Sequence, residues 1–91
     1  MKDVLDVEEI PAGAKAWMCR LNGDGSTFEA ICTVYELSET EIRVVGLMSK
    51  TSNTFERMRA VIEPEFRAMG YTKASYIRKG KLIEIFGEAA Q

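Results

Sequence analysis

The chain contains 91 residues with a mass of 10.2 kDa, a length that suits one domain with one hydrophobic core. Apolar residues make up 46% of the sequence and charged residues 29%, which favours a folded globular domain over a disordered chain. The net charge of -2 argues against nucleic-acid binding through bulk positive charge. The lack of histidine removes most zinc sites and every Ser-His or Cys-His nucleophile pair.

The first 15 residues carry several acids and pass through a turn at residues 11–14. Their apolar positions fit either a short edge strand or a loose arm, and the sequence leaves both open. These positions are Val4, Leu5, Val7 and Ile10.

Three strands are expected next. Residues 16–21 and 28–37 have the composition of β-strands, and the glycine-rich segment at residues 22–26 predicts a hairpin turn between them. A third strand is expected over residues 42–48. A second turn centred on Glu39-Thr40 would place Glu36 opposite Arg43 as a cross-strand ion pair. These strands would form an antiparallel meander.

A helix is expected after this meander, with Asn53 as its N-cap and Glu56 completing a capping box. Gly70 is expected to end the helix as a left-handed C-cap residue. Pro64 predicts a kink or a restart within it. The helix has one apolar stripe with spacings of three and four: Phe55, Met58, Ile62, Phe66 and Met69.

Two further strands are expected over residues 71–78 and 81–86, joined by a two-residue turn at Lys79-Gly80. This turn places Tyr76 opposite Ile83 and Ala74 opposite Ile85, and residues 87–91 form a small tail. The whole pattern predicts a single α+β domain over residues 1–91. Its antiparallel sheet has the order β-β-β-α-β-β, with one kinked helix packed on one face.

The second and third strands are apolar on both faces, whereas a sheet face that meets water usually carries alternating polar residues. One helix covers one face, so the other face is expected to form an interface with a second copy or another protein. The N-terminal arm could cover it instead. The face assigned to the interface consists of Phe28, Cys32, Val34, Val45 and Leu47. The opposite face is the alternative and consists of Ile31, Tyr35, Leu37, Ile42, Val44 and Met48.

A second hypothesis is single-stranded nucleic-acid binding by the last hairpin, where basic side chains alternate with tyrosines. In the competing interpretation, Tyr76 packs inward and the lysines protect an edge strand against aggregation. The residues concerned are Tyr71, Lys73, Tyr76, Arg78, Lys79 and Lys81.

A third hypothesis concerns the loop from Ser49 to Thr54, which precedes the predicted helix. Backbone amides at a helix start, together with Lys50, Thr51, Ser52 and Asn53, could bind a phosphate or carboxylate. The loop has no glycine, which phosphate-binding loops need, so a plain helix-capping loop is the competing interpretation.

No catalytic residue, metal site or cofactor is assigned, and we expect a non-enzymatic protein. The carboxylates show no spacing diagnostic of acid-base chemistry or metal binding. Cys19 and Cys32 form no C-x-x-C motif and no disulfide framework, and they fit reduced, buried thiols of a cytoplasmic protein. The sequence predicts neither a signal peptide nor a membrane-spanning segment.

The predicted order of three strands, helix and strand is similar to the central part of the Gcn5-related acetyltransferase fold. The matching positions are residues 47–53, the helix through Met69, and Gly70-Tyr71. In that family the helix after the third strand starts at the coenzyme A pyrophosphate, so the resemblance implies anion or acyl-CoA binding at the Ser49–Thr54 loop. The short, acidic chain also looks like small accessory proteins of bacteriophages, some of which inhibit host defence proteins.

Overall fold

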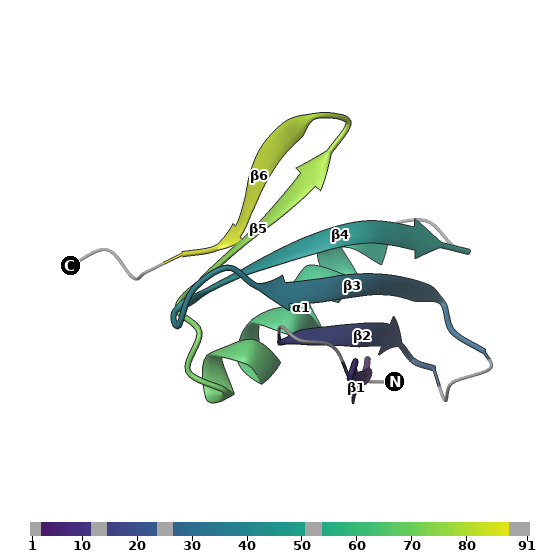
Figure 1. Ribbon diagram of the computed structural model, residues 1–91. Helices are drawn as coiled ribbons and strands as arrows, with labels where there is room; N and C mark the ends of the chain where they lie inside the picture. The colour runs from purple at the N-terminus through teal and green to yellow at the C-terminus, as the bar shows by residue number, and fades with distance from the viewer. Residues whose placement is uncertain (1–2, 12–14, 24–26, 51–53, 88–91) are drawn as a thin grey trace.

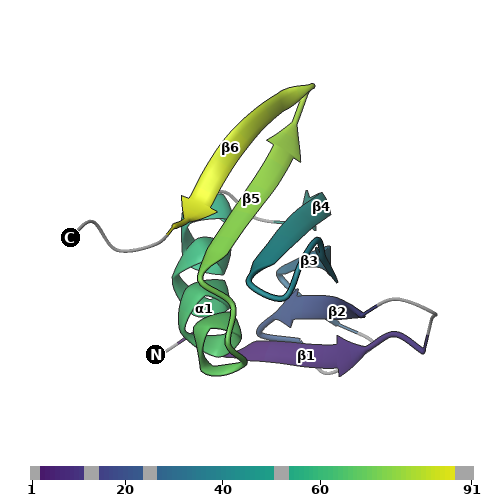
Figure 2. The ribbon, with the colours of Figure 1, turned by 60° about the vertical axis from the view of Figure 1, so that its left-hand side comes forward.

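The computed structural model describes residues 3–11, 15–23, 27–50 and 54–87 (Figure 1). These residues form one six-stranded sheet whose spatial order follows the order of the strands along the chain. A single described helix packs on one face of it (Figure 2). The elements are β1 (Leu5–Glu9), β2 (Ala16–Leu21), β3 (Ala30–Glu36), β4 (Glu41–Ser49), α1 (Thr54–Ala68), β5 (Lys73–Arg78) and β6 (Lys81–Phe86).

The α+β class and the order of the central elements are confirmed, but the prediction of a wholly antiparallel sheet is wrong. Strands β4 and β5 run parallel, with Glu41 opposite Lys73 and Val44 opposite Tyr76. The reason is α1, which carries the chain back along the sheet so that β5 starts at the same end as β4. The N-terminal segment forms the edge strand β1, antiparallel to β2. It therefore extends the sheet at its edge and does not cover either face.

Helix α1 ends at the glycine that the sequence marks. Gly70 has a φ of +106°, a region in which glycine carries no steric penalty. The Tyr71 N–H donates to the Phe66 carbonyl over 3.1 Å and the Gly70 N–H donates to the Arg67 carbonyl over 3.0 Å, which together form a Schellman motif. The helix runs through Pro64 without restarting. The predicted cap, Asn53, lies outside the described residues.

The core lies between α1 and the helix-facing side of the sheet. Phe66 is fully buried, and its ring centroid lies 5.2 Å from that of Trp17 and 6.3 Å from that of Tyr71. The buried face of α1 also includes Met58 and Ile62. These contacts hold the helix against the sheet, because buried aromatic rings contribute large apolar contact areas.

The register between β3 and β4 differs by one residue from the prediction. Tyr35 lies opposite Arg43, and Glu36 lies opposite Ile42, not opposite Arg43. The turn closes one residue earlier than expected, since the Leu37 N–H donates to the Glu41 carbonyl over 2.8 Å. A slip of one residue exchanges the two faces of a strand.

A β-bulge in β4 reverses which face of the sheet the residues after Gly46 point to. Gly46 has a φ of +66°, and the pairing jumps from Thr33–Val45 to Ile31–Met48. Gly46 and Leu47 together therefore oppose Cys32, the arrangement of a bulge with glycine in the left-handed region. As a result Leu47 packs against the core, whereas Met48 is 63% exposed.

The β5–β6 hairpin has the predicted two-residue turn. Lys79 and Gly80 have φ values of +51° and +79°, as a type I′ turn requires. The predicted pairing of Tyr76 with Ile83 is confirmed, but Ala74 lies opposite Phe86 because the register shifts between Ala74 and Ser75. In Figures 1 and 2 the hairpin rises away from the end of β4.

Two arginines of α1 form hydrogen bonds with backbone carbonyls at the C-terminal end of this hairpin. The Arg59 Nε donates to the Ile85 carbonyl over 2.8 Å, and an Arg67 Nη donates to the Gly87 carbonyl over 2.7 Å. No helix in the described part of the chain combines the length and apolar character needed to cross a membrane.

Candidate functional site

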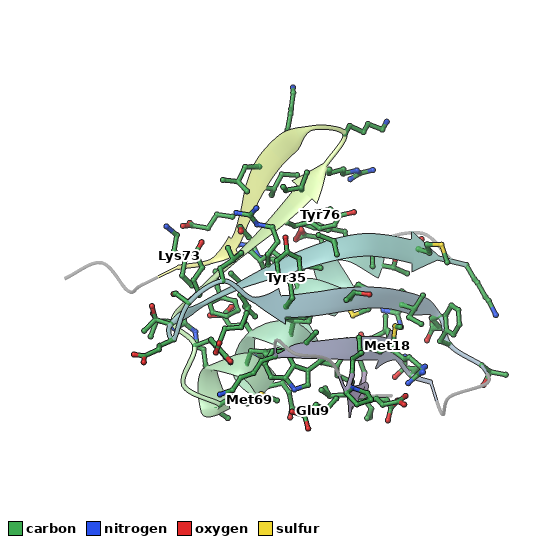
Figure 3. All side chains as sticks on the ribbon, viewed as in Figure 1. Glu9, Met18, Tyr35, Met69, Lys73 and Tyr76 are labelled. Atoms are coloured by element: carbon green, nitrogen blue, oxygen red, sulfur yellow. The ribbon has the colours of Figure 1, made fainter. Side chains whose placement is uncertain are left out.

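The face of the sheet opposite α1 is the candidate site, and we call it the open face. Figure 3 shows Met18 and Tyr35 on this side. Cross-strand pairing arranges the side chains of β2, β3 and β4 in three rows. The rows are Ala16–Tyr35–Arg43, Met18–Thr33–Val45 and Arg20–Ile31–Met48.

The centre of the open face is apolar and half-exposed. Met18, Ile31, Tyr35 and Val45 each retain intermediate exposure. The apolar character continues onto the hairpin, where the cross-strand neighbours Ile77 and Leu82 are 42% and 65% exposed. An apolar surface that spans several strands is typical of an interaction site.

The arginines on the open face are held by neighbouring groups. Arg20 forms ion pairs with Asp6 over 2.9 Å and with Glu8 over 3.0 Å, both on β1. Its buried Nε makes no hydrogen bond. The Arg43 Nε donates to the Ser75 Oγ over 3.0 Å. The charge of Arg20 is therefore compensated within the chain, whereas Arg43 is held by a neutral hydroxyl.

The interface residues assigned from the sequence do not form one surface. Val45 lies on the open face, but Cys32 and Val34 are 1% and 0% exposed and belong to the core under α1. Leu47 also packs against the core because of the bulge at Gly46. Half-buried Phe28 lies just before β3, and the Lys50 Nζ is 4.6 Å from its ring centroid.

The alternative face is also divided. Ile31, Tyr35 and Met48 lie on the open face, whereas Ile42 and Val44 are buried. Leu37 is 41% exposed beyond the end of β3. Each of the two predicted sets mixes both faces, because the assumed β3–β4 register was one residue off. Five residues of the open face belong to neither predicted set: Ala16, Met18, Arg20, Thr33 and Arg43.

The two cysteines lie directly opposite each other on β2 and β3, facing the core. A hydrogen bond with Cys32, together with burial, raises the pKa of the Cys19 thiol far above its usual value. A thiol that stays protonated and is shielded from solvent is a poor nucleophile. Their position fits the predicted reduced, buried thiols.

The tyrosines of the nucleic-acid hypothesis are buried. The Tyr71 hydroxyl donates to a Glu36 carboxylate oxygen over 2.6 Å, and burial with this neighbour raises the pKa of Tyr71 to about 12. Tyr76 is 7% exposed and packs with its ring centroid 5.4 Å from that of Phe55. Neither ring offers a free surface for base stacking. The basic residues Lys73, Arg78, Lys79 and Lys81 are exposed.

The predicted anion site falls largely outside the described residues. Thr51, Ser52 and Asn53 belong to that segment, and α1 begins at Thr54, which is 4% exposed. Lys50 is exposed beyond the end of β4. Anion or acyl-CoA binding at this loop stays a prediction.

A hollow lies where β4 and β5 part, on the side of α1. It is small and shallow, open to solvent and almost wholly apolar. This hollow could not be predicted from the sequence, because it depends on the parallel β4–β5 pair. Its lining residues are Val44, Leu47, Phe55, Met58, Arg59, Ile62, Tyr76 and Ile85.

An ion-pair network joins the N-terminal segment to α1. Arg57 binds Asp3 over 2.8 Å and Glu29 over 2.9 Å, and the Asn22 Nδ2 donates to both carboxylates. Hydrogen bonds from Arg57 and Asn22 lower the pKa of Asp3 to about 2 and also lower the pKa of Glu29. This network has a structural role in fixing β1.

The Asp3 carboxylate is expected to make the stability of the fold depend on pH in the acidic range. Its pKa of about 2 in the folded chain is below the usual 3.8, so its contribution is present above pH 4 and is lost as the pH falls to 2. We expect Asp3→Asn to lower the thermal midpoint at pH 7, and the difference from the wild type to shrink as the pH falls through 2. Glu39→Gln at the exposed turn is the matched control. A difference that persists unchanged at pH 2 would contradict this assignment.

Comparison with known proteins identified no family for this chain. A scan of protein-family models, a search of curated proteins and a search of solved structures each found no match.

Proposed function

We propose that the protein is a non-enzymatic interaction domain that binds a second copy of itself through the open face. The observation that carries this proposal is the apolar centre of the face, formed by Met18, Ile31, Tyr35, Val45 and Met48. Methionine and aromatic side chains are enriched at protein interfaces.

The charges favour a second copy as the partner. Arg20 and Arg43 are engaged by Asp6, Glu8 and Ser75 within the chain. Stacking two such faces about a two-fold axis sets apolar rows against apolar rows at the centre, with each Arg20 charge compensated by carboxylates of its own chain. Sheets stacked in this way lie about 10 Å apart and interdigitate their side chains.

The titration behaviour of the described residues supports a role other than catalysis. The strongest pKa shifts belong to Asp3, Cys19, Arg57 and Tyr71. Each of these groups is engaged by a neighbour within the fold: Arg57, Cys32, Asp3 and Glu36, respectively. Perturbed groups at catalytic sites usually converge on one cleft, whereas these four belong to three separate contacts: the Asp3–Arg57 ion pair, the cysteine pair and the Tyr71–Glu36 hydrogen bond.

Light scattering coupled to size exclusion tests the proposal. Across a hundredfold range of concentration we expect a mass of twice 10.2 kDa at the higher concentrations, with dissociation, if any, only on dilution. A mass of 10.2 kDa at every concentration would contradict self-association.

A further inference from the structure

Strand β4 has two strand neighbours over its first half and one over its second half. Its pairing with β5 ends at Val44–Tyr76, but its pairing with β3 continues to Ala30–Ser49. Residues 45–49 therefore have a strand partner only on the β3 side within the described chain. Figures 1 and 2 show the two strands diverging from this point.

The backbone of this segment has a donor directed into the space between the diverging strands β4 and β5, which we call the opening. The Lys50 N–H donates to the Glu29 carbonyl over 2.8 Å, so it points toward the β3 side. Backbone groups alternate in direction along a strand, and the Ser49 N–H therefore points the other way, toward the opening. An exposed strand edge of this kind is a template for another extended chain.

The hollow described above lies at this opening and offers an apolar contact site for one side chain. The hollow lies at the base of the opening, between Leu47 of β4, Phe55 of α1, and Tyr76 and Ile85 of the hairpin. A strand lying along β4 directs alternate side chains to opposite faces. One apolar side chain of such a strand would reach the hollow while its neighbours stay in solvent.

The charge around the opening is mainly positive. Lys50 follows the end of β4, Arg59 borders the hollow, and Arg78, Lys79 and Lys81 surround the hairpin turn. On α1, the Glu56 Oε1 lies 4.0 Å from an Arg59 Nη. A positive rim favours a negatively charged occupant.

We propose that an acidic peptide segment in extended conformation binds here as an added strand along β4, with one apolar side chain in the hollow. Main-chain hydrogen bonds would supply affinity, and the hollow with its basic rim would supply specificity. This inference goes beyond self-association, because it uses a strand edge and not the open face.

Fluorescence polarisation with a defined probe tests the proposal. The probe is a fluorescein-labelled peptide in which glutamate and apolar residues alternate. The apolar residues are valine, leucine and valine, in that order. We expect saturable binding that weakens at high salt, and no binding of the same peptide with lysine in place of each glutamate.

Two variants of Ser49 then isolate the backbone contact. Ser49→Pro removes the N–H that points into the opening, whereas Ser49→Ala keeps it and changes only the exposed side chain. We expect Ser49→Pro to weaken probe binding by about tenfold or more, with Ser49→Ala close to the wild type. Circular dichroism checks that both variants keep the sheet.

Three results would overturn the inference. These are equal probe affinity in folded Ser49→Pro and Ser49→Ala, no probe binding by the wild type, and displacement of the probe by coenzyme A at lower concentration than by unlabelled peptide. The last result would identify a coenzyme A ligand instead. Light scattering on the same samples reports self-association separately, so a failure of one proposal is distinguishable from a failure of the other.

Discussion

Replacing Phe66 with alanine is expected to lower the free energy of unfolding by about 3–5 kcal/mol, the usual cost of removing a buried aromatic ring. Phe66 is 0% exposed and contacts both Trp17 and Tyr71. Its carbonyl also accepts the hydrogen bond that closes the C-terminus of α1. The substitution would therefore leave a cavity at the point where helix, sheet and helix cap meet. Urea denaturation followed by tryptophan fluorescence measures the loss, because Trp17 borders the cavity.

Met69→Ala provides the matched control for this experiment. Met69 is on the same predicted apolar stripe, but it is 43% exposed and lies just beyond the end of α1. Its truncation should cost well under about 1 kcal/mol, as expected for a partly exposed side chain. Equal losses for the two variants would contradict the assignment of Phe66 to the centre of the core.

Val45→Glu is expected to abolish self-association at concentrations where the wild type forms dimers. Val45 lies in the central row of the open face, next to Thr33 on β3. In a two-fold dimer the substitution brings two carboxylates, one from each copy, into an apolar interface. Burying unpaired like charges is costly, and we expect the dissociation constant to rise by roughly 100-fold or more. The mass from light scattering should fall to the monomer value.

Ala60→Glu is the control for this substitution. Ala60 is exposed on α1, on the other side of the molecule from the open face, and the change in charge is the same. This variant should keep the wild-type mass, and both variants should keep the wild-type circular dichroism. A dimer that survives Val45→Glu but not Ala60→Glu would place the interface on the helix side.

The individual elements could be predicted because their signals are local. The bounds of β2 and β6 match the prediction, and the two-residue turn follows from Gly80, which tolerates the positive φ that a type I′ turn requires. The end of α1 follows from Gly70 in the same way. Each of these features depends on residues close together in the sequence.

The relations between elements could not be predicted in the same way. The direction of β5 depends on where α1 returns the chain, and the sequence of α1 does not contain that information. The β3–β4 register depends on a one-residue difference in a polar turn between Leu37 and Glu41. That difference divided the predicted interface, so that only Val45 of its five residues lies on the open face. Gly46, as a single glycine in a strand, was the available signal for the bulge.

The agreement between strand order and chain order bears on how the protein folds. Four of the five strand pairs in the described sheet join consecutive antiparallel strands, so their contacts close short loops and contact order stays low. The pair β4–β5 is the exception, because a whole helix must form and dock before those strands meet. This parallel seam is therefore expected to assemble late and to open first during partial unfolding, with the terminal hairpin separating as one cooperative unit.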